Sequence, residues 1–266
     1  MNRTVFLLLM LVLATEALYA GDGKVTLFII GDSTVKNGRG DGTGGLRGWG
    51  EKIYLFLDTT QIAVRNHALA GTSSRTFITR GLWDQVLKRL QPGDVLLLQF
   101  GHNDGGAIND TLRARGTIRG IGEEIVEIDN LLTQKHEIVH SYGWYLRRMI
   151  REAKAKGAIP VVITPIPRND WEDGKVKRTP ASYPQWAMEV AREEKVRGID
   201  LNRLMSEKLD SFGEEQVTGR FFLSTDHTHT TEEGAVMSAS LLARALKQSK
   251  KCRLSKWMLP IRKLPY

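Results

Sequence analysis

The chain has 266 residues, of which 41% are hydrophobic, and its formal net charge at pH 7 is +8. A chain of this length is long enough for one large α/β domain, and no linker or internal repeat divides it. Its only cysteine, Cys252, excludes an internal disulfide, and its position far from the N-terminus excludes a lipoprotein anchor.

The first residues have the pattern of a secretory signal. Arg3 gives a positive start, residues 5–14 form an apolar core, and Ala20 is a small residue at the expected cleavage point. The apolar core is too short to span a membrane comfortably, although an uncleaved anchor is the alternative. We therefore expect residues 1–20 to be removed, which leaves a secreted or periplasmic protein without a membrane span.

The mature chain alternates short apolar, β-branched runs with segments of helical periodicity. In chain order we predict a strand at 24–30, a glycine-rich loop at 38–50, a helix at 51–58, a strand at 61–66, a helix at 82–90, a strand at 94–100, a polar insertion with one short helix at 107–134, a helix at 137–156, a strand at 158–164, a helix at 183–195, a weak strand at 198–201, a helix at 203–212 and a last helix at 232–247. This order predicts an α/β domain over residues 21–247, with a parallel sheet covered on both faces.

The positive charge is concentrated at the end of the chain. From Lys247 to the C-terminus there are seven Lys or Arg and no Asp or Glu. We predict that residues 248–266 form a solvated basic tail outside the domain. The alternative is an electrostatic contact with anionic envelope or pectic polymers. We expect a monomer that binds no nucleic acid.

Three motifs follow the first three predicted strands. Ser33 comes directly after the first strand, Gly71 after the second and Asn103 after the third. The carboxyl ends of parallel strands meet at one edge of a sheet, where α/β folds open into a crevice. Asp226 and His229, three residues apart, arrive from the far end of the chain just before the last helix. We therefore expect all five residues to meet at this edge.

These residue types suit nucleophilic catalysis. A serine hydroxyl is a poor nucleophile unless a base takes its proton, and histidine is suited to that at neutral pH. A carboxylate then fixes the tautomer of the histidine and stabilises the imidazolium. Ser33, His229 and Asp226 supply these three groups. The backbone N–H groups of Ser33 and Gly71 and the side-chain amide of Asn103 would serve as donors to a developing oxyanion.

Four blocks of the sequence carry a resemblance to a known family. They are GDSTVKNG at 31–38, NHALAGTSSR at 66–75, FGHNDGG at 100–106 and DHTHT at 226–230. With these blocks the chain resembles the SGNH (GDSL-like) hydrolase superfamily and, within it, the rhamnogalacturonan acetylesterases. The absence of a G-x-S-x-G elbow counts against the ordinary α/β-hydrolase fold.

The resemblance implies a flavodoxin-like three-layer α/β/α sandwich with a central parallel sheet of about five strands, and a serine esterase that needs no cofactor. Ser33 matches the family nucleophile, Asp226 and His229 match its acid and base, and Gly71 and Asn103 match its oxyanion donors. The glycine-rich loop after Ser33 and the polar insertion depart from the family pattern. Both departures bear on the shape of the substrate cleft more than on the reaction.

A second motif points to different chemistry. Residues 136–140 spell H-E-x-x-H, which on a helix holds zinc through its two histidines, with the glutamate as general base. Such a site needs a third ligand, and Leu146 stands where the extended motif has its last histidine. We therefore expect no metal site, and we consider His140 as a substrate contact in the cleft, although a histidine on the helix surface is the simpler interpretation.

Two more side chains near the motifs need an interpretation. His227 directly follows Asp226, but the spacing of His229, one turn away, is better for an Asp–His hydrogen bond, so we assign the base to His229. Trp171 lies in the polar loop 168–175 and is our candidate for stacking on a sugar ring, although tryptophans are more often core residues.

Taken together, these patterns predict a carbohydrate O-acetylesterase that acts on acetylated polysaccharide, with acetylated rhamnogalacturonan in pectin as the leading substrate. A lipid or peptidoglycan esterase of the same superfamily is one alternative. A long acyl chain would require an apolar groove, and the glycine-rich, polar loops around the site give little sign of one. A non-catalytic glycan-binding module and an H-E-x-x-H zinc hydrolase are the others.

Overall fold

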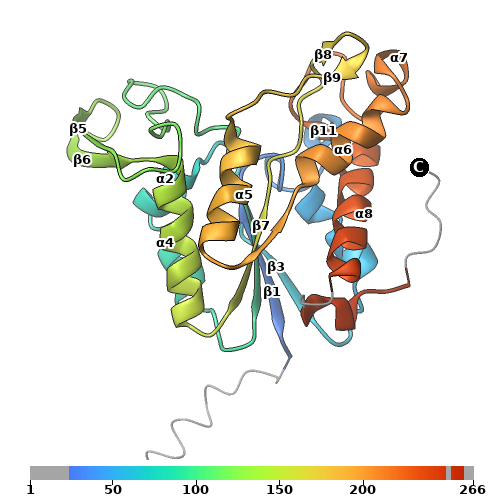
Figure 1. The fold of residues 1–266 in the computed structure, drawn as a ribbon, viewed down its shortest axis with the longest axis horizontal. Coiled ribbons are helices and arrows are strands. Elements are labelled where there is room, and N and C mark those ends of the chain that lie inside the picture. The colour runs from blue at the N-terminus through green and yellow to red at the C-terminus, as the bar shows by residue number, and fades with distance from the viewer. Residues whose placement is uncertain (1–23, 250–252, 261–266) are drawn as a thin grey trace, which may run out of the picture.

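The structure is a computed structural model that describes residues 24–249 and 253–260. Its centre is a parallel sheet of five strands in the order β10-β7-β4-β1-β3 (Figure 1). The strands are β1 (Thr26–Gly31), β3 (Ala63–Asn66), β4 (Val95–Gln99), β7 (Ile159–Ile163) and β10 (Arg197–Ile199). The predicted α/β class and the five-stranded parallel sheet are confirmed.

The apolar strands are buried on both sides, because their alternate side chains enter two separate cores. Along β1, Leu27 and Ile29 belong to one core and Phe28 and Ile30 to the other. Fully burying a side chain of this kind contributes about 1.5–3 kcal/mol. A continuous apolar run is therefore what a central parallel strand requires.

Helices cover each face of the sheet, so the domain has three layers (Figure 1). One core is closed by α2 (Ser74–Thr79), α3 (Leu82–Leu87), α4 (Tyr142–Ala155) and α5 (Tyr183–Glu193). The other core is closed by the short turns η2 (Trp49–Glu51) and η3 (Ile53–Phe56) and by α6 (Leu201–Asp210), α7 (Glu214–Val217) and α8 (Glu232–Gln248).

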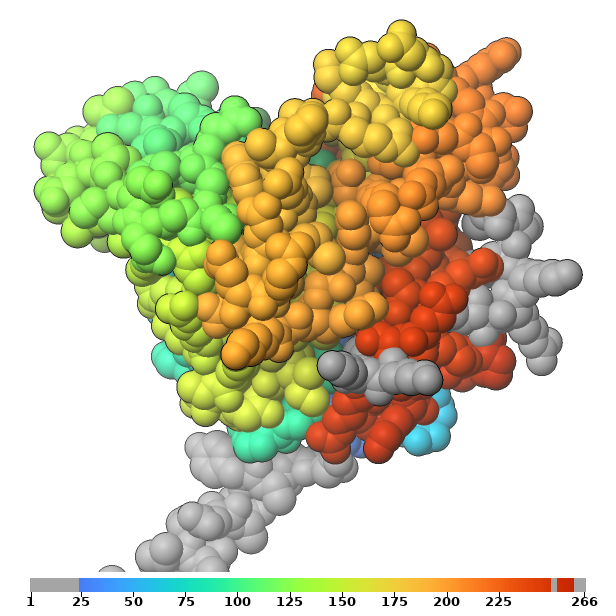
Figure 2. Space-filling view, viewed as in Figure 1, coloured from blue at the N-terminus to red at the C-terminus, as the bar shows by residue number. Residues whose placement is uncertain are grey.

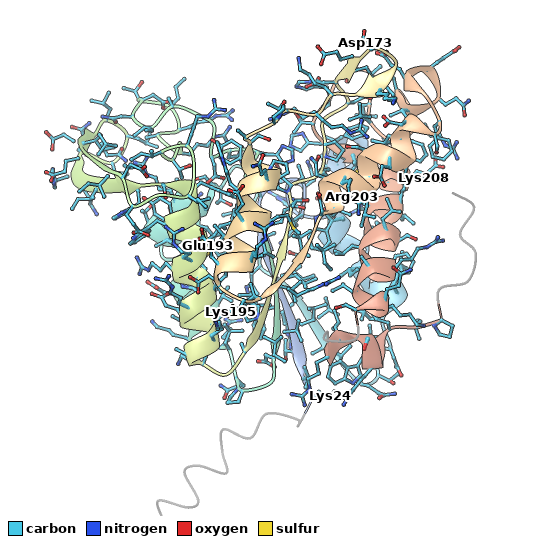
Figure 3. The ribbon with its side chains drawn as sticks, in the orientation of Figure 1. Lys24, Asp173, Glu193, Lys195, Arg203 and Lys208 are labelled. Atoms are coloured by element: carbon cyan, nitrogen blue, oxygen red, sulfur yellow. The ribbon has the colours of Figure 1, made fainter. Side chains whose placement is uncertain are left out.

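Small elements surround the carboxyl ends of the strands. They are η1 (Thr43–Gly45), the pair β2 (Leu46–Arg47) and β11 (Thr230–Thr231), the hairpin β5 (Ile125–Asn130) and β6 (Lys135–His140), and the hairpin β8 (Trp171–Glu172) and β9 (Lys175–Val176). Figure 2 shows the two hairpin regions rising on either side of a hollow. In Figure 3, Asp173 marks this end of the molecule and Lys24, just before β1, marks the opposite end.

Two of the predicted helices are wrong. Residues 51–58 form no α-helix: residue 51 ends the 3₁₀ turn η2, and residues 53–56 form the 3₁₀ turn η3. The helix predicted at 137–156 begins only at Tyr142, where Ser141 caps it by accepting a hydrogen bond from Trp144 N. Residues before Ser141 belong to strand β6, and the buried Val139 shares an apolar spacing with Tyr142 that resembles a helical period.

The polar insertion also differs from the prediction. No helix forms between residues 107 and 140, and its second half pairs with β6 as the antiparallel hairpin β5–β6. Helix α2 was missed because it is only six residues long. Its start is visible in retrospect, since Ser73 and Thr76 cap it reciprocally through side chain and backbone.

The C-terminal segment packs on the domain instead of leaving it. In the 3₁₀ helix η4 (Arg253–Trp257), Leu254 is fully buried in the core, and Met258 bridges to Leu57. The prediction of a solvated tail is therefore wrong for residues 253–260. The predicted signal at residues 1–20 lies outside the described residues. Within those described, no helix is both long enough and apolar enough to cross a membrane.

Candidate active site

Ser33 follows β1 in a turn built on its neighbour Asp32. The Asp32 carbonyl accepts hydrogen bonds from the backbone N–H groups of Val35 and Lys36, both at 3.1 Å. Its Oδ1 accepts two more from Thr34, at 2.9 Å from the backbone and 2.7 Å from the hydroxyl. These bonds end the strand abruptly and leave Ser33 9% exposed at the carboxyl edge of the sheet.

A buried polar chain holds this turn against the sheet. Trp49 Nε1 donates to Gln99 Oε1 at 2.8 Å, and Gln99 Nε2 donates to Thr34 Oγ1 at 2.7 Å. Gly31 permits the close approach, because a Cβ there would lie 2.6 Å from the Gln99 carbonyl oxygen and 2.5 Å from a Val35 methyl. The position of Ser33 is therefore fixed by neighbours on two strands.

His229 contacts both Ser33 and Asp226, although 196 residues separate it from the serine. Its Nε2 lies 2.8 Å from Ser33 Oγ, and its Nδ1 lies 2.7 Å from Asp226 Oδ2. The loop closes on itself because Asp226 Oδ1 accepts the backbone N–H groups of Thr228 at 2.8 Å and His229 at 2.9 Å. The five predicted motif residues thus include three that form one continuous hydrogen-bond chain.

The electrostatics of this chain favour an ionised aspartate. Burial alone would raise the pKa of Asp226, but hydrogen bonds from the backbone and ring of His229 and from the backbone of Thr228 outweigh it, so the pKa of the Asp226 carboxyl is lowered. An ionised Asp226 accepts the Nδ1 proton of His229, which leaves Nε2 unprotonated toward Ser33. This is the tautomer that a general base needs.

His227 points elsewhere. Its Nδ1 lies 2.5 Å from Asp170 Oδ1, and the side chain is exposed. Its backbone carbonyl accepts a hydrogen bond from Asn169 N at 2.7 Å. His227 therefore joins its own loop to the β8–β9 region, while His229 occupies the place beside Ser33.

Gly71 and Asn103 lie in loops that are tied to the serine turn. Leu69 N donates to the Gly31 carbonyl at 3.0 Å, and Asn103 Nδ2 donates to the Thr72 carbonyl at 2.8 Å. Gly71 has a φ of 80°, a left-handed conformation that favours glycine. Asn103 is buried, and its amide nitrogen carries two hydrogens, of which this bond uses one. The second hydrogen is available to another acceptor.

Two buried titratable groups, His102 and Asp104, flank Asn103 in its loop. Burial lowers the pKa of His102 to about 4, so its ring is neutral at pH 7. Burial raises the pKa of Asp104 to about 7, although its Oδ1 accepts hydrogen bonds from Ser74 N at 3.1 Å and Ser74 Oγ at 2.5 Å. Asp104 thereby holds the first residue of α2 against the end of β4.

The H-E-x-x-H segment is a strand and not a helix. On a strand, two histidines four residues apart are separated by about 13 Å, which is too far for one metal ion. Glu137 accepts a bidentate hydrogen bond from Arg75, and His136 lies 3.4 Å from Asp129 in the same hairpin. The described part of the chain holds no group of three side chains placed to ligate a metal.

The two predicted sugar contacts are occupied by neighbouring side chains. His140 stacks on Trp144 with their ring centroids 3.7 Å apart. Trp171 packs on the core and donates from Nε1 to Asn169 Oδ1 at 2.8 Å. Neither residue lines the two cavities described next. Their roles as substrate contacts stay predictions.

Two cavities adjoin the site, and they share one residue that sequence reasoning missed. The larger, of about 1160 Å³, lies between the Asn103 loop and the start of α5, and the smaller, of about 730 Å³, lies between α2 and the β5–β6 hairpin. Arg115 lines both, and its Nη1 donates to the Gly71 carbonyl at 3.1 Å. Arg168, also in the larger cavity, donates to Thr228 Oγ1 beside His229. The arginines at 113, 115 and 119 were the available signal.

Comparisons with known proteins show which family the chain belongs to. Residues 29–236 match the GDSL-like Lipase/Acylhydrolase family. A probable rhamnogalacturonan acetylesterase, YesY of Bacillus subtilis, is 32% identical over 225 residues, which are 84% of this chain and 92% of that protein. A rhamnogalacturonan acetylesterase of Emericella nidulans is 28% identical over 221 residues, which are 83% of this chain and 84% of that protein.

Among solved structures, the YxiM protein of Bacillus subtilis superposes with a TM-score of 0.68 at 28% identity, covering 85% of this chain and 56% of that longer chain. An acetylxylan esterase from Geobacillus stearothermophilus shares the fold, with a TM-score of 0.54 at 19% identity over 85% of this chain and 93% of that one. The family match spans most of the described domain and includes Ser33, Asp226 and His229. The chain therefore belongs to the GDSL-like lipase/acylhydrolase family and is a carboxylic ester hydrolase.

Proposed function

We propose that this protein is a serine esterase that removes O-acetyl groups from plant cell-wall polysaccharide, with acetylated rhamnogalacturonan as its substrate. The observation that carries the proposal is the hydrogen-bond chain from Ser33 Oγ through His229 to Asp226, with distances of 2.8 Å and 2.7 Å. The two curated relatives named as rhamnogalacturonan acetylesterases support the choice of substrate.

In the first half of the reaction, Ser33 Oγ attacks the acetyl carbonyl carbon while His229 Nε2 takes the hydroxyl proton. The carbonyl electron pair moves to the oxygen, and the backbone N–H groups of Ser33 and Gly71 and the free amide hydrogen of Asn103 stabilise the resulting oxyanion. When the tetrahedral species collapses, the bond to the sugar oxygen breaks. His229 returns the proton to that oxygen, and the deacetylated sugar hydroxyl leaves.

The second half repeats these steps with water. His229 Nε2 takes a proton from a water molecule, whose oxygen attacks the acetyl-Ser33 ester. Collapse breaks the bond to Ser33 Oγ, which recovers its proton from His229, and acetate is released. Asp226 keeps its negative charge throughout and stabilises the imidazolium at each half-reaction. None of these steps draws on a group outside the chain and water.

We also propose that the protein is exported through the signal at residues 1–20, so that it meets polymeric substrate outside the cytoplasm. The charged residues lining the larger cavity favour a polar substrate over a long acyl chain. A lipid esterase is therefore the second candidate.

Acetate release from a panel of acetylated rhamnogalacturonan, xylan, mannan and peptidoglycan tests the proposal. We expect the highest rate on rhamnogalacturonan, and p-nitrophenyl acetate should be cleaved much faster than the octanoate. A folded Ser33→Ala variant should lose activity on every ester. Preference for the octanoate would favour a lipase, and full activity of Ser33→Ala would overturn the mechanism.

A further inference from the structure

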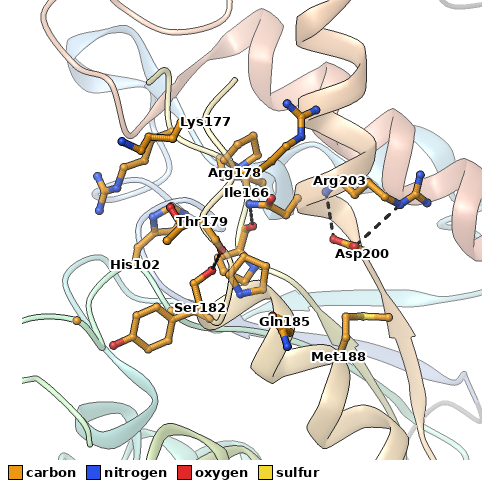
Figure 4. Close-up of a pocket in the computed structure, with 18 of the residues that line it drawn as sticks. His102, Ile166, Lys177, Arg178, Thr179, Ser182, Gln185, Met188, Asp200 and Arg203 are labelled. Carbon is orange, nitrogen blue, oxygen red and sulfur yellow. Dashed lines mark hydrogen bonds and ion pairs between the residues drawn. The ribbon is translucent and has the colours of Figure 1, made fainter. Parts of the chain in front are cut away.

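The larger cavity is wide enough for several sugar residues. Its volume of about 1160 Å³ exceeds the roughly 300–1,000 Å³ typical of small-ligand sites. Figure 4 shows His102 and Lys177 on one side and the hydrogen-bonded pair of Asp200 and Arg203 on the other. Because His102 is part of the loop that carries Asn103, a ligand in this cavity lies beside the proposed reacting groups.

The charges lining this cavity are unbalanced. Seven arginine or lysine side chains line it against four acidic ones. Three of the acids already have partners: Asp170 pairs with His227, and Asp200 and Glu207 pair with Arg203. The fourth, Glu189, accepts a hydrogen bond from Gln185. The acidic side chains therefore leave most of the cations uncompensated.

Five of these cations have no ion pair with any described carboxylate, unlike Arg178, which is paired with Asp210. Three of the five are exposed, namely Arg119, Lys177 and Arg192. Arg115 and Arg168 are each half-buried, and each makes a single hydrogen bond, to the Gly71 carbonyl and the Thr228 hydroxyl. One arginine thus stands beside the Gly71 loop and the other beside the loop of His229.

A half-buried arginine without a counter-ion is unfavourable unless a ligand supplies the charge. Removing a cation from water costs free energy, and an anion that makes well-aligned hydrogen bonds to the cation offsets this cost. At Arg115 burial is the main influence and lowers its pKa, and the neighbouring Arg113 adds to the effect, while the more distant carboxyls of Asp32, Asp104 and Asp110 oppose it only in part. Arg168 also lies close enough to His102 to lower the pKa of that ring. The side chains that line the cavity therefore carry an excess of positive charge.

We propose that Arg115 and Arg168, with Lys177 at the rim, bind the carboxylates of uronate residues in the polysaccharide and make the enzyme selective for acidic over neutral acetylated glycans. This inference rests on the esterase function proposed above. Arginine presents a planar pair of donors that matches a carboxylate. Since Arg115 lines both cavities, uronates on either side of the acetylated sugar can reach it.

Binding to the full-length Ser33→Ala protein tests the assignment without turnover. The probes are trigalacturonate and the same trisaccharide after its carboxyl groups have been reduced to alcohols, titrated by calorimetry at low and high salt. We expect trigalacturonate to bind at least tenfold more tightly than the reduced probe, with an advantage that shrinks as salt rises. Equal binding of the two probes would overturn the proposal.

Substitutions locate the interaction. Arg168→Gln and Arg115→Gln, each in the Ser33→Ala background, should weaken trigalacturonate binding about tenfold and leave binding of the reduced probe within about twofold. Arg168→Lys should recover part of the loss. The matched control is Arg203→Gln, since Arg203 lines the same cavity but is paired with Glu207. An equal loss in the control would show diffuse charge attraction and overturn the assignment.

Activity of the wild-type protein separates this inference from the proposed function. If wild-type protein releases no acetate from any ester but trigalacturonate binding depends on Arg115 and Arg168, the esterase proposal fails and the uronate site stands. If acetate is released equally from acetylated pectin and its carboxyl-reduced form, and neither substitution changes this ratio, the uronate site fails and the esterase proposal stands. If either Arg115→Gln or Arg168→Gln fails to fold, the other variant still tests the proposal.

Discussion

Arg75 and Glu137 form a bidentate ion pair that joins helix α2 to strand β6. Arg75 Nε and Nη2 donate to the two Glu137 oxygens at 2.7 Å and 2.6 Å, and the arginine side chain is fully buried. Its Nη1 also donates to the carbonyls of Ile108 and Gly116, at 2.7 Å and 2.8 Å. One side chain therefore fixes the insertion that carries Arg115 against the domain. The glutamate of the H-E-x-x-H motif has this structural partner.

We expect Glu137→Gln to lower the free energy of unfolding by about 3 kcal/mol, because it leaves the buried Arg75 charge without its counter-ion. For a domain of this size the melting temperature should fall by about 6–12 °C. Arg203→Gln breaks an exposed pair and should change stability by less than about 1 kcal/mol. Urea unfolding of the three proteins measures this, and equal stabilities would contradict the structural role of the pair.

The two histidines of the DHTHT block should behave differently when they are substituted. His229→Ala removes the group that contacts Ser33 Oγ, so kcat on p-nitrophenyl acetate should fall by about 10⁴-fold or more. His227→Ala removes only the surface pair with Asp170 and should keep kcat within about threefold. Thermal melts show whether both variants fold. The reverse order of effects would reassign the base to His227.

Asp104 should make stability depend on pH. Its pKa is raised by burial from 3.8 to about 7 in the folded protein, so between these values the folded state holds a proton that the unfolded state has lost. Stability must then fall as pH rises through this range, by about 1.4 kcal/mol per pH unit, and level off above it. His102 acts in the opposite direction. Because burial lowers its pKa from 6.5 to about 4, the unfolded state holds the extra proton between these values, and stability rises with pH over this range.

The comparison of wild type with Asp104→Asn isolates the aspartate from the histidine. The asparagine keeps an oxygen to accept the Ser74 bonds but does not titrate. We expect the unfolding free energy of wild type minus that of the variant to fall with pH from 5 to 7 and to be constant above 8. Urea unfolding at each pH provides this difference. A difference that does not change with pH would mean that Asp104 is ionised throughout.

The contact between Ser33 and His229 could be predicted from the sequence because it depends mainly on the order of the strands in the sheet. Ser33, Gly71 and Asn103 each lie in the loop that follows a strand, so a parallel sheet brings them to one edge whatever the lengths of the connections. The Asp226–His229 pair is local and closes its own loop. These features depend on short-range bonds and on the sheet, both of which leave clear patterns in the residues.

The positions of Arg115 and Glu137 could not be predicted in the same way. The Arg115 loop is shaped by Asp110 Oδ1, which accepts three backbone N–H groups, and by Thr117 N, which donates to the Asp104 carbonyl. Residues 137–140 have an apolar spacing that also fits a helix, but they form strand β6 because they pair with β5. The contacts that place these two residues are long-range, since Arg115 reaches Gly71 across 44 residues and Glu137 reaches Arg75 across 62. Nothing in the local pattern specifies that they form.

The side-chain amide of Asn103 has two possible roles, one in holding the Gly71 loop and one in stabilising the oxyanion. Its amide donates to the Thr72 carbonyl at 2.8 Å, which steadies the Gly71 loop, and its second hydrogen is the proposed oxyanion donor. The structural bond is worth about 1 kcal/mol of stability. An oxyanion donor acts only in the transition state, so the two roles predict different kinetic patterns for the same substitution.

We expect Asn103→Ala to lower kcat by about 10²–10³-fold, or 2.7–4 kcal/mol, with KM little changed, because the lost interaction belongs to the transition state. Asn103→Asp should be at least as damaging, since a carboxylate cannot donate to Thr72 and faces the developing negative charge. Asn109→Ala is the matched control: Asn109 also donates its amide to a backbone carbonyl, that of Asp129 at 3.0 Å, and its loss should leave kcat within about threefold. Steady-state kinetics on an acetyl ester, with a thermal melt of each variant, decide the matter. A stable Asn103→Ala enzyme that keeps kcat within about threefold of wild type would show that Asn103 holds the loop and does not stabilise the oxyanion.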